Sequence, residues 1–134
     1  MDERTLELFN RSFESCVARP GFLERFYAIF IDSSPDVRGK FEHTDLKRQA
    51  QIVKKSLYIL TMASLETEEV LEEIARLGQS HGREGMKIET RMYELWLDCL
   101  LQAVREFDPR WSPEVGESWR RMFSPYLSRL KEYS

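Results

Sequence analysis

Apolar residues recur at intervals of three and four along almost the whole chain, and no segment alternates apolar and polar residues for long. This period is typical of α-helices that bury one face. The clearest runs lie within residues 6–17, 22–30, 46–60, 70–77, 92–104 and 115–130. The pattern therefore predicts an all-α fold and gives no sign of a β-sheet.

Turn-forming and helix-capping residues separate these runs. Ser34 has a side chain suited to capping a helix, and Pro35 follows where a helix does not need the missing amide proton. We therefore expect a short extra helix that ends near Gly39. In total we expect six or seven helices in a single domain over residues 1–134. The separating residues are Pro20-Gly21, Ser34-Pro35, Thr44-Asp45, Thr67, Asp108-Pro109 and Ser112-Pro113.

The composition narrows the functional classes. The 134 residues are 42% hydrophobic and 32% charged, with a net charge of -3. Acidic and basic residues are interleaved without a basic stripe, which argues against nucleic-acid binding. No apolar run is long enough to cross a membrane. The charged start also lacks the apolar core of a secretory signal, so we expect a cytoplasmic protein. Cys16 and Cys99 are expected to be small buried groups in a reducing compartment.

Groups that could perform chemistry are scarce. The chain has no glycine-rich phosphate loop and no cluster of cysteines and histidines with metal-ligand spacing. It has only two histidines, of which His43 lies among polar residues and is expected to be exposed. This scarcity makes the position of His81 informative.

His81 continues the apolar face of its helix. Val70, Ile74, Leu77 and His81 are spaced four, three and four residues apart. A neutral imidazole binds iron well when its other nitrogen has an acceptor, which the Leu77 carbonyl or the Ser80 hydroxyl could supply. The position alone equally fits a histidine that the helix dipole favours at a helix end. The order of other residues decides between the two interpretations.

That order resembles the globin family across essentially the whole chain. The resemblance is closest to the single-domain bacterial haemoglobins and to the globin part of flavohaemoglobins. It implies a globin fold around a haem pocket, with haem b (iron protoporphyrin IX) as cofactor and His81 as the proximal ligand to the iron. The residues that carry it are Phe26-Tyr27, Ser34-Pro35-Asp36-Val37-Arg38, Phe41, Gln49, Val53 and His81.

The resemblance places Tyr27 and Gln49 on the distal, ligand-binding side, beside Val53 as an apolar wall. A phenol O–H and an amide N–H are both donors, and donors in a dry pocket stabilise the partial negative charge of bound dioxygen. Gln51 is an alternative, because the stretch leading into this helix is shorter than in the family. The apolar period favours Gln49, since Val53 follows it one turn later, whereas Lys55 follows Gln51.

Further pocket residues are implied by the same resemblance. Phe41 is expected to stack on the haem. Tyr93 could take the place of the proximal tyrosine of flavohaemoglobins, but the glutamate that accompanies it there is not identified. Cations or hydroxyls near the haem propionates could come from Lys47, Arg48, Ser80 or Arg83, although ordinary surface positions explain these residues equally well. The remaining expected haem contacts are Val53, Leu77, Ser80, Met86, Ile88 and Leu97.

The function that we expect first is reversible binding of dioxygen, or of carbon monoxide or nitric oxide. The alternative is a nitric oxide dioxygenase or a peroxidase-like haem enzyme that needs a separate reductase. A gas sensor would need a partner protein for its output. A haem-free interaction module is disfavoured, because such a module has no need of His81.

Overall fold

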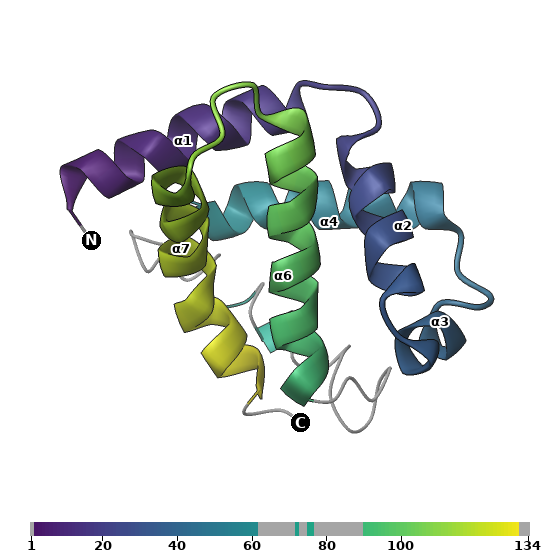
Figure 1. The fold of residues 1–134 in the computed structure, drawn as a ribbon. Coiled ribbons are helices and arrows are strands. Elements are labelled where there is room, and N and C mark those ends of the chain that lie inside the picture. The colour runs from purple at the N-terminus through teal and green to yellow at the C-terminus, as the bar shows by residue number, and fades with distance from the viewer. Residues whose placement is uncertain (1, 62–71, 73–74, 77–89, 132–134) are drawn as a thin grey trace.

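The computed structural model describes residues 2–61, 72, 75–76 and 90–131, and every regular element within them is an α-helix. Figure 1 shows their arrangement. The all-α prediction is therefore confirmed. The expected helix that Thr67 would cap falls mostly outside the described residues. The described helices are α1 (Glu3–Val17), α2 (Phe22–Asp32), α3 (Pro35–Lys40), α4 (Leu46–Thr61), α6 (Thr90–Phe107) and α7 (Pro113–Lys131).

Helix α6 is central in the packing. It contacts α2 on one side and α7 on the other, while α1 packs mainly on α7 and α4 packs on α2. In Figure 1, α1 lies across one end of the pair formed by α6 and α7, and α3 lies beyond the end of α2. Helix α2 thus packs against α3, α4 and α6, and the predicted distal residues Tyr27 and Gln49 lie on α2 and α4.

The helix boundaries follow from capping. Ser34 Oγ accepts a hydrogen bond from the amide of Asp36 at 3.2 Å, as predicted for the start of α3. Ser112 Oγ accepts one from the amide of Val115 at 3.2 Å at the start of α7. Gly21 turns the chain into α2 with a φ of 86°, a left-handed conformation that glycine adopts without a Cβ clash.

Aromatic side chains fill much of the core. Trp119, Phe9 and Phe26 are fully enclosed, and Phe22 and Phe123 are 1% exposed. One expectation is wrong, because Leu46 was placed on the buried face of its helix and is 38% exposed. It is the first residue of α4, and a helix end is covered on fewer sides than its middle. The other buried large side chains include Phe13, Tyr27, Phe30, Leu57, Met92, Leu100 and Met122.

The two cysteines and His43 lie as predicted. Cys16 and Cys99 are buried free thiols. Burial raises the pKa of the Cys16 thiol to about 12, so it stays protonated at neutral pH. His43 is exposed. Within the described ranges, no helix is both long and apolar enough to cross a membrane.

Candidate functional site

Tyr27 belongs to an aromatic cluster formed by α2 and the C-terminal end of α3. Its side chain is 2% exposed. Its ring centroid lies 4.9 Å from that of Phe26 and 5.8 Å from that of Phe41. Tyr27 faces inward because it shares the buried face of α2 with Leu23 and Phe30. A phenol hydroxyl is thereby held inside an otherwise apolar environment.

Gln49 approaches that hydroxyl from α4. Burial raises the pKa of Tyr27 above its ordinary value, and a side-chain hydrogen bond with Gln49 acts in the opposite direction. Gln49 is partly buried, whereas Gln51 is exposed. Gln51 lines a groove of about 340 Å³ beside the turn that joins α1 and α2.

Three further predicted residues are buried or partly buried in the core. Phe41 is 8% exposed, caps the C-terminal end of α3 and lies 5.9 Å from the ring of Phe30. Val53 is partly buried and packs on the core from α4. Leu97, on α6, is 5% exposed. Phe41, Val53 and Leu97 thus provide apolar surface, with the Tyr27–Gln49 pair as polar atoms.

Tyr93 also lies on α6, and its hydroxyl is exceptional. The side chain is 5% exposed, and the buried hydroxyl oxygen has no hydrogen-bond partner within the described structure. Burial raises the pKa of Tyr93 to about 12. A buried polar atom without a partner is costly, and structures rarely keep one without a reason. This hydroxyl is a polar atom that a bound group could satisfy.

Apart from Tyr93, most of the predicted proximal side falls outside the described residues. This is where His81 lies, together with Leu77, Ser80, Arg83, Met86 and Ile88. Lys47 and Arg48 are described and are exposed. Among the described side chains, no group of three or more His, Cys, Asp or Glu could hold a metal ion. The geometry therefore describes one side of the predicted site, the side with Tyr27 and Gln49.

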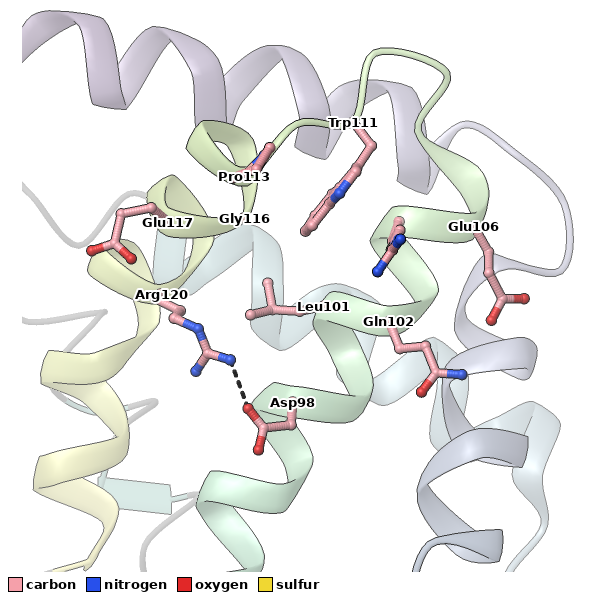
Figure 2. A pocket seen from close by; sticks show the side chains of 10 residues that line it. Asp98, Leu101, Gln102, Glu106, Trp111, Pro113, Gly116, Glu117 and Arg120 are labelled. Carbon is pink, nitrogen blue, oxygen red and sulfur yellow. Dashed lines mark hydrogen bonds and ion pairs between the residues drawn. The ribbon is translucent and has the colours of Figure 1, made fainter.

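A separate groove of about 730 Å³ lies between α6 and α7, and the sequence reasoning did not identify it. Figure 2 shows Leu101 and Trp111 at its apolar part and Arg120 joined to Asp98 across it. The distance between Arg120 Nη2 and Asp98 Oδ1 is 2.7 Å. A Cβ on Gly116 would lie 2.6 Å from the Trp111 ring, so glycine is what lets the indole lie against α7. None of the predicted site residues lines this groove.

Comparisons with known proteins agree with this arrangement. The globin family profile matches residues 24–129. Flavohemoproteins from Bacillus thuringiensis and Bacillus anthracis are 30% identical over 84 residues, which is 61% of this chain and 20% of theirs. The chain thus spans about a fifth of the length of these relatives. A crystal structure from Pseudomonas aeruginosa PAO1, described as structurally highly homologous to a human hemoglobin, superimposes with a TM-score of 0.89. It is 32% identical, and the match covers 96% of this chain and 97% of that one.

Proposed function

Because this chain belongs to the globin family, we propose that it binds haem b and reversibly holds dioxygen or another diatomic gas. The observation that carries the proposal is the buried Tyr27 hydroxyl with the Gln49 amide beside it. A phenol hydroxyl buried among aromatic rings is costly unless it has a hydrogen-bond partner. A small polar ligand held against it would be such a partner.

The described residues fit a haem on chemical grounds. A flat, largely apolar macrocycle needs apolar side chains around it, and Phe41, Val53 and Leu97 supply them from three elements. When bound, the haem would supply an iron atom with an open position for a diatomic gas. His81 would be the protein ligand to that iron. Leu77, Ser80, Met86 and Ile88 would complete the proximal wall.

Tyr27 and Gln49 would act on the bound gas as donors. The raised pKa of Tyr27 keeps its hydroxyl protonated at neutral pH, so the phenol can donate a hydrogen bond. The Gln49 amide donates to the phenol oxygen, which leaves the phenol proton free to point at the ligand. Donors fixed in a water-excluded site stabilise partial negative charge more strongly than water does. The pair should therefore slow the release of dioxygen more than that of carbon monoxide, which carries less negative charge.

Nitric oxide dioxygenation is the second candidate function. The observation in its favour is the similarity to flavohemoproteins, 30% identity over 84 residues. A separate reductase would then have to return electrons after each turnover. Consumption of nitric oxide that continues for many turnovers with an added reductant, and stops without it, would favour this candidate. A single turnover followed by arrest would favour the binding protein. A sensing role would instead require a partner that responds to the gas.

The first experiment is an absorption spectrum of the purified protein after reconstitution with haem, reduction and exposure to dioxygen and carbon monoxide. We expect a sharp Soret band that both gases shift. His81→Ala should abolish or greatly weaken haem retention, because this substitution removes the proposed iron ligand. His43→Ala is the matched control, since His43 is exposed. A normal spectrum in His81→Ala would contradict the ligand assignment, and no haem uptake by the wild type would contradict the proposed function.

A further inference from the structure

The groove between α6 and α7 has the size of a small-molecule site. Its volume is about 730 Å³, and ligand pockets occupy roughly 300–1,000 Å³. One wall is a stripe of α6 side chains within residues 98–106, and the facing wall is a stripe of α7 side chains within residues 113–120 (Figure 2). Two packed helices therefore build the groove, and Trp111, from the connection between them, closes one side of it.

The fold holds Trp111 in place as the apolar side of the groove. The Trp111 amide donates to the Asp108 carbonyl at 3.1 Å, and the buried Asp108 side chain accepts a hydrogen bond from the Arg110 amide at 2.8 Å. Gly116 lets the indole lie against α7, since a Cβ there would lie 2.6 Å from the ring. Leu101 is 7% exposed and adds apolar surface from α6. A flat apolar group would therefore meet a surface that is already formed.

The charged side chains of the groove are paired, with one exception. Among those that line it, only Arg105 forms no ion pair within the described structure. Its side chain is exposed. The groove therefore keeps one positive charge that no carboxylate of the described chain compensates. The paired groups are Asp98 with Arg120 at 2.7 Å, Glu106 with Arg25 at 2.9 Å and Glu117 with Arg121 at 3.3 Å.

A free guanidinium beside an apolar surface favours one chemical class of ligand. A guanidinium binds a carboxylate through two parallel N–H···O bonds, and an aromatic ring packs well on an indole. Trp111 Nε1 is a further donor, because the Trp111 side chain has no hydrogen-bond partner in the described part of the chain. A cationic ligand is disfavoured, since it would meet Arg105 and find the carboxylates of the groove already paired.

We propose that this groove binds a small carboxylate that carries a flat aromatic group, with the ring against Trp111 and Leu101 and the carboxylate on Arg105. The inference goes beyond the proposed function and does not depend on it, because none of the predicted haem contacts lines the groove. Binding uses non-covalent contacts alone, so no bond is made or broken.

Matched probes and variants separate the two parts of this recognition. 1-Naphthylacetate and 1-naphthylacetamide share the ring and differ in charge, and acetate has the carboxylate without the ring. Arg105→Gln removes the charge and keeps a polar side chain. Arg110→Gln is the matched control, because Arg110 is also exposed and also lacks an ion pair in the described structure, but does not line the groove. Both substitutions are at exposed positions, so both variants should fold.

The experiment measures the affinity of the purified protein for each probe by isothermal titration calorimetry. We expect 1-naphthylacetate to bind about tenfold more tightly than 1-naphthylacetamide, because a hydrogen bond to a charged group contributes about that factor. Acetate should not bind at the same concentrations. The preference for the carboxylate should disappear in Arg105→Gln and remain in Arg110→Gln.

The site of binding is read from the indole N–H signals in a nitrogen–proton correlation spectrum. Trp111→Phe identifies the Trp111 signal by its loss. We expect 1-naphthylacetate to shift this signal and to leave that of Trp119 in place, because Trp119 is fully buried and its Nε1 already donates to Ser12.

The outcomes distinguish this inference from the proposed function. Equal affinities for the two naphthyl probes, or no binding of 1-naphthylacetate at millimolar concentration, would overturn the groove proposal. A preference that persists in Arg105→Gln would overturn it as well, and Arg105 would then be only a cation that the dipole favours in the last turn of α6. An unmoved Trp111 signal would place the ligand elsewhere and have the same consequence. Absence of a Soret band would overturn the haem proposal alone, since neither measurement depends on haem.

Discussion

The two ends of the aromatic core treat buried polar atoms differently. Between α1 and α7, Trp119 Nε1 donates to Ser12 Oγ at 2.9 Å, and both groups are buried. Between α2 and α4, Gln49 lies close enough to the Tyr27 hydroxyl to affect its pKa, and on α6 the Tyr93 hydroxyl has no partner within the described structure. The first end is closed with respect to hydrogen bonding, because its buried donor and acceptor satisfy each other. The second end has polar capacity left over, because a buried hydroxyl there still lacks a partner.

This difference separates a packing role from a binding role. A buried donor and acceptor that satisfy each other fix the relative position of two helices and leave nothing for a ligand. A buried hydroxyl with remaining capacity stabilises the fold less but can contact a further group. The α1–α7 end should therefore be the one on which stability depends, and the α2–α4–α6 end the one on which ligand binding depends.

Trp119→Ala should produce the largest effect on stability. It empties a fully buried site and leaves the Ser12 hydroxyl without its partner. We expect the free energy of unfolding to fall by about 3–5 kcal/mol, measured by urea denaturation. Tyr27→Phe, at the other end, is the comparison and should change it by about 1 kcal/mol or less. Equal losses in the two variants would remove the distinction between the ends.

Much of the fold could be predicted from the sequence because helices leave a strong local signal. Ser34 and Ser112 cap the helices that they were predicted to cap. The apolar period also placed Phe9, Trp119 and Leu100 in the core. It failed at Leu46, because periodicity marks a face of a helix but not how far along that face the neighbouring helix extends.

The candidate site was less predictable, because periodicity marks a face of a helix but not which residues of another helix lie against it. The resemblance to the globin family pointed to Tyr27 and Gln49, and the apolar period favoured Gln49 over Gln51. The structure adds the burial of Tyr27 and the groove that Gln51 lines. The unpartnered Tyr93 hydroxyl depends on contacts between helices distant in sequence. No local pattern carries that information.

Tyr27→Phe should have the largest effect on ligand release. Removing one donor in a dry pocket costs about 1–3 kcal/mol, or roughly five- to 150-fold in the dissociation rate of dioxygen. Because burial raises the pKa of Tyr27, the phenol stays protonated through neutral pH. The ratio of variant to wild-type rates should therefore be constant over about pH 6 to 9. Stopped-flow displacement by carbon monoxide measures it, and an unchanged rate would leave Tyr27 as a packing residue.

Gln49→Leu should have a smaller effect in the same direction. The substitution removes the amide that holds the Tyr27 hydroxyl, at a cost of about 0.5–1.5 kcal/mol to retention of the gas. Gln51→Leu is the matched control, because Gln51 is on the same helix and exposed. The same displacement measurement should show faster release in the first variant and wild-type release in the second. Faster release in Gln51→Leu alone would assign the distal role to Gln51 and leave Gln49 without it.

Tyr93→Phe should have the smallest effect and tests the polar capacity of the second end directly. Removing a buried hydroxyl without a partner should leave the free energy of unfolding unchanged or raise it by about 1 kcal/mol. The folded-state pKa of about 12 lies above the ordinary tyrosine value, so the folded protein keeps this proton at a pH where the unfolded chain has lost it. The free energy of unfolding should therefore fall as the pH rises from about 10 to 12, and the fall should be smaller in Tyr93→Phe, which keeps Tyr27 and Cys16 as other buried groups with a raised pKa. Thermal denaturation across this range measures both effects. A clear loss of stability in Tyr93→Phe at neutral pH would mean that the hydroxyl is already bonded, and the second end would then be as closed as the first.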